Sequence, residues 1–160
     1  MNTWQRISSA AVVCGTISLD IGLASGAIGT SGTYKSPNGT WTYRDFAGAT
    51  PDTGKQSATL VVSGKSITGT GNDNDGCKDN YSMTLKNTAT VNKYTVAGSF
   101  VENCGGGDVT TYKVTNGTFI YKKTNTNKFK LNGTIKTKGI SGTATGGLLT
   151  ETFNGTRQTS

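Results

Sequence analysis

The chain has 160 residues, which is enough for one domain with a hydrophobic core. Only 32% of the residues are hydrophobic and 16% are charged, but the apolar residues alternate with polar ones, which excludes a disordered chain. The formal charge of +7 favours attraction to anionic surfaces, and the lack of histidine excludes His-assisted nucleophiles and the commonest metal ligand.

The first residues differ from the rest of the chain. Arg6 precedes an apolar stretch over residues 7–23, and the small residues 24–27 follow. This pattern predicts a signal peptide over residues 1–26, and hence a secreted or periplasmic protein without a transmembrane span. Asp20 is atypical of an apolar signal region, so a hydrophobic N-terminal strand is the alternative.

After the leader, we expect a linker over residues 27–38 and a single domain over residues 39–160. Alternation of apolar and polar residues predicts strands throughout that domain. Asn116-Gly117 is a strong hairpin signal, so the two runs beside it are expected to pair across a turn. The expected strands cover residues 39–46, 56–63, 66–71, 81–86, 94–104, 109–115, 118–123, 128–136, 140–145 and 148–157.

Turn signals recur about every eight to twelve residues along this domain, and no helical period is present. We therefore predict an all-β fold, an antiparallel up-and-down meander of about 8–10 strands. Such a meander avoids exposed edge strands best by closing into a barrel, and a β-sandwich is the alternative.

The triplet Gly39-Thr40-Trp41 resembles the G-x-W signature of the calycins, which include the lipocalins and avidins. The resemblance implies that Trp41 closes one end of a barrel and that Arg157, from the last strand, packs across its ring in a cation–π contact. A calycin-like barrel would bind a ligand in its mouth or on its loops, and an interior cavity would be lined by aromatic residues of the inner face: Tyr81, Tyr94, Phe100 and Tyr112. Avidins use several tryptophans for biotin, whereas residues 27–160 contain only Trp41, so biotin is not expected. The alternative is that Trp41 is a core aromatic residue.

Removal of the leader would leave two cysteines, Cys77 and Cys104. An even number in an exported chain predicts a disulfide between them, worth roughly 3–4 kcal/mol of stability in the chain-entropy model. The bond would also gather five carboxylates at one end of a basic protein: Asp73, Asp75, Asp79, Glu102 and Asp108.

The segment 72–76 places oxygen ligands at alternate positions before a glycine, as calcium loops do. Asp73, Asp75 and Asp79 are the candidate calcium ligands, and no other cofactor is expected. The segment lacks the terminal glutamate of an EF-hand, so a solvated loop paired with Lys78 is the alternative.

A second candidate site is basic. Six lysines follow one another on neighbouring strands and could attract an anionic surface, or could serve only to keep the protein soluble; no sequence-specific nucleic-acid binding is expected. These are Lys122, Lys123, Lys128, Lys130, Lys136 and Lys138.

Together these patterns predict an exported, monomeric, non-catalytic binding protein for a small ligand or an anionic surface. No motif marks a catalytic pair of carboxylates, so a glycan-active hydrolase is only an alternative. An inhibitor or interaction module that uses the disulfide-linked loops is another. An interior cavity would favour a small ligand, a filled core with protruding loops would favour the interaction module, and a cleft holding two carboxylates would favour the hydrolase.

Overall fold

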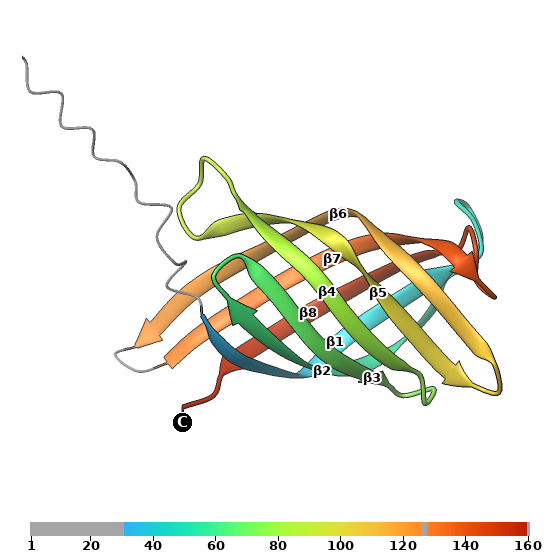
Figure 1. Cartoon of the computed structure of the whole chain (residues 1–160), viewed down its shortest axis with the longest axis horizontal. Helices are drawn as coiled ribbons and strands as arrows, with labels where there is room; N and C mark the ends of the chain where they lie inside the picture. The colour runs from blue at the N-terminus through green and yellow to red at the C-terminus, as the bar shows by residue number, and fades with distance from the viewer. Residues whose placement is uncertain (1–30, 126–127, 160) are drawn as a thin grey trace, which may run out of the picture.

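The computed structural model describes residues 31–125 and 128–159, so the predicted signal peptide lies outside the described residues. These residues form eight β-strands and no helix (Figure 1). The strands are β1 (Gly32–Arg44), β2 (Asp52–Ser63), β3 (Ser66–Asp73), β4 (Lys78–Asn87), β5 (Lys93–Gly105), β6 (Asp108–Asn125), β7 (Lys128–Gly142) and β8 (Leu148–Arg157).

The strands close into one barrel in chain order. Each strand pairs antiparallel with the next, and β1 pairs with β8, so the sheet has no free edge. This confirms the all-β, up-and-down barrel and not the β-sandwich. No helix in the described part of the chain is long and apolar enough to cross a membrane.

Strand β1 corrects the expected boundary between linker and domain. It begins at Gly32, so much of the segment expected to be a linker belongs to the barrel. The pairing of β1 shifts between Ser36 and Gly39, and Pro37 lies in this irregularity, where a residue without an N–H is tolerated. The buried Ser36 hydroxyl accepts a hydrogen bond from the backbone N–H of Asn154 on β8, at 2.8 Å.

The hairpin expected at Asn116-Gly117 is wrong. Strand β6 continues through both residues, with a register shift beside Val114 where a turn was expected. Gly117 is buried, and a Cβ atom there would lie 3.1 Å from both Ile135 Cγ2 and Val96 Cβ. The glycine therefore provides room for the core instead of a turn.

Side chains fill the middle of the barrel. Tyr81 and Phe100 have ring centroids 5.2 Å apart, and Phe100 stacks on Tyr112 at 5.1 Å. Phe119 and Phe153 are equally buried and lie 5.5 Å apart. The middle of the barrel is therefore a packed core and not a hollow interior.

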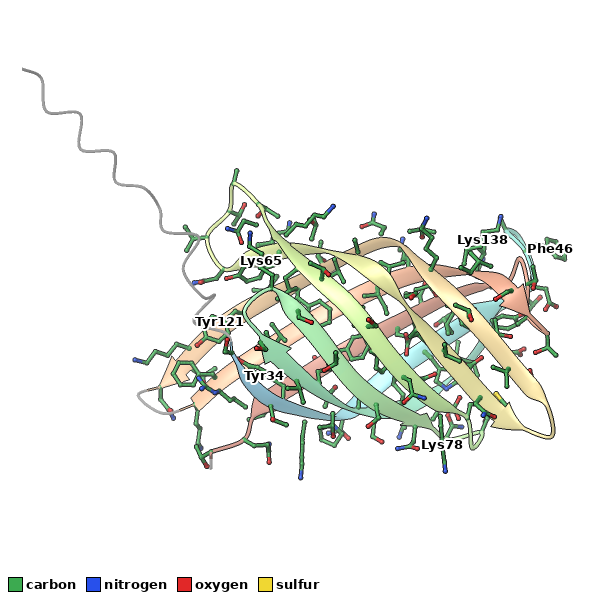
Figure 2. All side chains as sticks on the ribbon, viewed as in Figure 1. Tyr34, Phe46, Lys65, Lys78, Tyr121 and Lys138 are labelled. Atoms are coloured by element: carbon green, nitrogen blue, oxygen red, sulfur yellow. A yellow bond between two sulfur atoms is a disulfide. The ribbon has the colours of Figure 1, made fainter. Side chains whose placement is uncertain are left out.

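The two ends differ in charge. We call the end formed by the loops after β1, β3, β5 and β7 the acidic mouth, and the end formed by the loops after β2 and β4 and by the β6–β7 hairpin the basic mouth. The chain has nine acidic residues, and the eight that follow Asp20 lie on the strands and loops of the acidic mouth. Figure 2 shows Phe46, Lys78 and Lys138 toward this mouth and Tyr34, Lys65 and Tyr121 toward the other.

Candidate functional site at the acidic mouth

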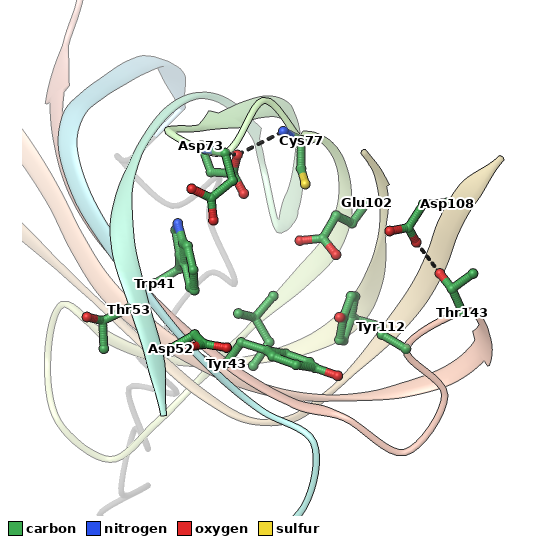
Figure 3. Close-up of a pocket in the computed structure, with 13 residues that line it drawn as sticks. Trp41, Tyr43, Asp52, Thr53, Asp73, Cys77, Glu102, Asp108, Tyr112 and Thr143 are labelled. Atoms are coloured by element: carbon green, nitrogen blue, oxygen red, sulfur yellow. Dashed lines mark hydrogen bonds between the residues drawn. The ribbon is translucent and has the colours of Figure 1, made fainter. Parts of the chain in front are cut away.

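A cavity of about 510 Å³ opens at the acidic mouth (Figure 3). This volume lies within the usual range of small-molecule sites. The loops and strand ends of the whole mouth contribute to it, and the lining residues are Trp41, Tyr43, Asp52, Thr53, Asp73, Asp75, Cys77, Glu102, Asp108, Tyr112, Thr143, Ala144 and Leu149.

Trp41 forms one wall, and a glycine on the neighbouring strand determines its position. Gly54 pairs with Trp41 across β1 and β2, and a Cβ atom there would lie 2.5 Å from the indole ring. The indole Nε1 donates a hydrogen bond of 3.3 Å to Asn74 Oδ1, which also accepts the Lys55 N–H at 2.8 Å. The Trp41 ring therefore packs on the backbone of Gly54, and the hydrogen bond from its Nε1 to Asn74 fixes its orientation.

Tyr43 is positioned in the same way. A Cβ atom on Gly147 would lie 2.6 Å from the Tyr43 ring, so the ring packs over this glycine. Its hydroxyl donates a hydrogen bond of 3.0 Å to Asp45 Oδ1. Burial, the Asp45 hydrogen bond and nearby carboxylates raise the pKa of Tyr43, so its hydroxyl stays protonated at neutral pH.

Two carboxylates of the rim are held by local hydrogen bonds. Asp73 Oδ1 accepts the backbone N–H groups of Asp75 at 2.9 Å and Cys77 at 2.8 Å, which fixes the β3–β4 turn. Asp108 accepts a hydrogen bond from the Thr143 hydroxyl, which joins the loops after β5 and β7.

Glu102 is a partly buried carboxyl of the lining. Burial, followed by the charges of Asp79 and Asp73, raises its pKa to about 7, while a hydrogen bond from Tyr112 acts in the opposite direction. Near neutral pH this group therefore changes protonation state readily, unlike a solvated glutamate.

Below the cavity lie two fully enclosed carboxyls joined by one tyrosine. The Tyr81 hydroxyl lies 2.6 Å from Glu151 Oε1 and 3.2 Å from Asp79 Oδ2. Gly71 makes room for this group, because a Cβ atom there would lie 2.8 Å from both Asp79 Oδ2 and the Tyr81 hydroxyl. We call Asp79, Tyr81 and Glu151 the floor group.

The raised pKa values of the two carboxyls favour a proton within the floor group. Burial raises the pKa of Asp79 to about 6, and burial together with the Asp79 charge raises the pKa of Glu151 well above its ordinary value. Tyr81 has one hydroxyl proton, so it can donate a hydrogen bond to only one of the two carboxyls at a time. A proton on Glu151 supplies the second hydrogen bond, because Glu151 can then donate it to the Tyr81 oxygen while Tyr81 donates to Asp79. Within the described chain, Asp79 Oδ1 and Glu151 Oε2 remain buried without a hydrogen-bond partner.

The predicted disulfide between Cys77 and Cys104 is present, with the two Cα atoms 3.9 Å apart. It joins the start of β4 to the end of β5 next to the cavity. Among the described residues, Cys77, Glu102 and Cys104 bring three potential metal-ligand atoms within 4.8 Å of one another. Because the sulfurs are bonded to each other, they are not available as thiolate ligands.

The expected ligand residues separate into three places. Trp41 and Tyr112 line the cavity, whereas Tyr81 and Phe100 pack in the core beneath it. Tyr94 lies toward the basic mouth, where it pairs with Phe119.

The expected contact between Arg157 and Trp41 is wrong. Strand β8 pairs Arg157 with Tyr34 and pairs Glu151 with Trp41, so the arginine lies at the basic mouth. Its guanidinium lies over Phe129, 5.2 Å from the ring centroid. The cation–π contact is thus made with a residue of the β6–β7 hairpin.

The three candidate calcium ligands also diverge. Asp73 and Asp75 line the cavity, whereas Asp79 is buried and bonded to Tyr81. Among the described residues they do not form a cluster of three converging ligand atoms. Calcium binding at this mouth stays a prediction.

The six lysines of the candidate basic face do not share one end. Lys122 pairs with Lys130 near the tip of the β6–β7 hairpin, and Lys123 and Lys128 are close to them. Lys138, in contrast, pairs with Leu148 at the start of β8, toward the acidic mouth. The lysine-rich end of the barrel is therefore smaller than expected.

The sequence interpretation missed Tyr43, Asp52 and Glu151. The alternation of Leu149, Glu151 and Phe153 contained a signal, because it places a carboxyl on the inner face of β8. No sequence pattern marks Gly54 and Gly147 as the glycines on which Trp41 and Tyr43 pack, because these contacts form between different strands.

No protein-family model matches the chain, and neither the curated proteins nor the solved structures contain a significant match.

Proposed function

We propose that this protein is an exported, calycin-like barrel that binds a small ligand at its acidic mouth and does not transform it. The observation that supports this best is the distribution of space. The core is filled by aromatic side chains, while a cavity of ligand size opens at one mouth.

The chemistry of the lining supports the same proposal. Trp41 and Tyr43 present ring faces that are seated on glycines, and such rigid rings bind a ligand with little loss of side-chain freedom. Carboxylates supply polar contacts around them. Small-molecule sites commonly combine apolar walls with a few polar groups in this way.

Binding can be tested by amide chemical-shift mapping with a panel of neutral, anionic and cationic small molecules. We expect at least one class to shift the amides around the acidic mouth. Asp52→Trp, at an exposed lining position that pairs with Tyr43, would fill part of the cavity and should abolish those shifts. Thr68→Trp, at an exposed position of β3 outside the lining, should preserve them. Lack of binding by every class, or shifts confined to the β6–β7 hairpin, would reject the proposal.

Export is part of the proposal. The disulfide supports an oxidising compartment, such as the cell exterior or a periplasm. The apolar N-terminal sequence and the small residues that follow it support cleavage near Gly26 or Ala27. The intact mass of the protein recovered from the secreting host tests this directly, because retention of residues 1–26 would contradict it.

A further inference from the structure

The cavity carries charge of one sign. Five of its lining residues are carboxylic acids, and no lysine or arginine lines it. They are Asp52, Asp73, Asp75, Glu102 and Asp108. Carboxylates gathered in this way repel one another unless solvent or a bound cation separates them.

The cavity walls are aromatic on several sides. Trp41, Tyr43 and Tyr112 come from β1 and β6 and surround the same space as the carboxylates (Figure 3). The face of an aromatic ring attracts a cation within about 6 Å of its centroid, most strongly when water is excluded. The aromatic rings and the carboxylates of the cavity therefore both favour a cationic ligand.

The floor group adds an observation independent of the rim. Asp79 is only 4% exposed and pairs directly across β4 and β5 with Glu102, a lining residue. Opposed residues of antiparallel strands share a face of the sheet, so both carboxyls are directed into the barrel at this mouth. Asp79 Oδ1 has no hydrogen-bond partner among the described residues. An unpaired buried carboxyl oxygen is costly, and a positive ligand group near it would lower that cost.

We infer that the ligand is an organic cation whose ammonium group lies between the Trp41 and Tyr43 rings and the carboxylates of Asp52 and Glu102. This rests on the proposed function, since it names the ligand class of the same cavity.

An organic ammonium ion fits this cavity better than a bare metal ion. Calcium needs six to eight oxygen ligands that converge at about 2.3–2.6 Å. Among the described residues, the one cluster of three close ligand atoms contains the two disulfide sulfurs. A volume of about 510 Å³ with ring faces suits a larger and less strongly hydrated cation.

Cation binding should displace a proton from Glu102. This residue faces Asp79 on β4, Asp73 at the end of β3, and Tyr112 and Asp108 on β6. Burial and these carboxylates raise its pKa to about 7. Tyr43 on β1 and Glu151 on β8 also interact with Glu102 electrostatically. A bound ammonium ion favours the charged carboxylate, so proton release should accompany binding near pH 6.5.

Isothermal titration calorimetry with paired probes tests the inference. Choline and butylammonium are compared with their neutral isosteres, 3,3-dimethylbutan-1-ol and butan-1-ol, and with calcium chloride. We expect at least one ammonium ion to bind about tenfold or more tightly than its isostere at low salt. Titrations at pH 6.5 in buffers of different ionisation enthalpy should show proton release.

Two variants make the same change of net charge, inside and outside the cavity. Asp52→Asn alters a lining residue and should weaken ammonium binding by about tenfold, whereas Thr68→Lys, at an exposed position of β3 outside the lining, should change it by less than about twofold. Equal weakening by both variants would overturn the inference, because it would mean that only the net charge of the protein, and not a carboxylate in the cavity, affects ammonium binding.

The remaining outcomes separate the inference from the proposed function. If an isostere binds as tightly as its ammonium partner, the cavity binds ligands but charge does not select them. If calcium binds and neither ammonium ion does, the site is a metal site and the inference is overturned. If neither ammonium ion binds, the inference is overturned, and the proposed function falls as well if the neutral and anionic compounds of the shift-mapping panel also fail to bind.

Discussion

Tyr81 joins the two buried carboxyls beneath the acidic mouth. Its hydroxyl is within hydrogen-bonding distance of both Glu151 and Asp79, and its ring packs against Phe100 and Phe153. One side chain thus links the apolar core to the charged cavity. Removal of its oxygen atom should leave both carboxyls without their shared partner.

We predict that Tyr81→Phe lowers the free energy of unfolding by about 1–3 kcal/mol, the usual cost of leaving a buried polar group unsatisfied. Urea unfolding at neutral pH measures this. Tyr43→Phe is the matched control, since it also removes a tyrosine hydroxyl bonded to an aspartate, but at a half-exposed position. Its effect should stay within about 0.5 kcal/mol. Equal effects of the two variants would show that the floor group contributes no special stability.

At the scale of the strands, glycines determine where aromatic rings lie. Gly54 and Gly147 seat the two rings of the cavity, and Gly133 does the same in the core for Phe119. A missing side chain on one strand leaves a depression that a ring from the next strand fills. The ring then covers the exposed backbone of the glycine.

Gly133→Val should be strongly destabilising. A Cβ atom there would lie 2.5–2.7 Å from Phe119 ring atoms, and Phe119 is fully buried and cannot move aside. Overpacking of this kind costs about 1–3 kcal/mol, which thermal or urea unfolding would detect. Lys130→Ala, at an exposed position of the same strand, should have little effect. A fully stable Gly133→Val protein would contradict the close packing of β6 on β7.

At the scale of the whole molecule, the barrel is electrically polar. The eight acidic residues after Asp20 gather at one mouth, although the net charge of the protein is +7. The lysine pair Lys122 and Lys130 lies at the other end, on the β6–β7 hairpin. A cationic ligand would therefore approach one mouth preferentially, and added salt should slow its association.

This polarity predicts an unusual dependence of stability on pH. The pKa of Asp79 rises from 3.8 to about 6 on folding, and that of Glu102 rises from 4.5 to about 7. Between about pH 4 and pH 7 the folded protein thus holds protons that the unfolded chain has released, so its stability should fall as the pH rises. The stabilisation from the protons on Asp79 and Glu102 is fully present below about pH 4 and is lost above about pH 7.

Melting temperatures in buffers of equal ionic strength measure this dependence. The melting temperature should be higher at pH 4.5 than at pH 7.5, and Glu102→Gln should flatten the upper part of the curve. A steady rise in melting temperature from pH 4 to pH 7 would contradict the raised pKa values. Choline, if it binds as inferred, should reduce the difference by stabilising the protein at the higher pH.

Sequence alone determined much of this protein. Alternation with period two revealed the strands and the inward side of residues such as Tyr81 and Leu85, because successive residues of a strand face opposite sides of the sheet. The cysteine count predicted the disulfide, and the spacing of the acids around it predicted a cluster of carboxylates at one end.

Only the tertiary structure decided the rest. Asn116-Gly117 has the local chemistry of a turn, but contacts with Ile135 and Val96 from other strands place it within β6. Arg157 packs on Phe129 and not on Trp41 because the register of β8 against β1 separates them. The cavity itself arises from the closure of eight strands around a core that ends below the mouth. Such pairings join residues far apart in the chain, so no local pattern of residues can specify them.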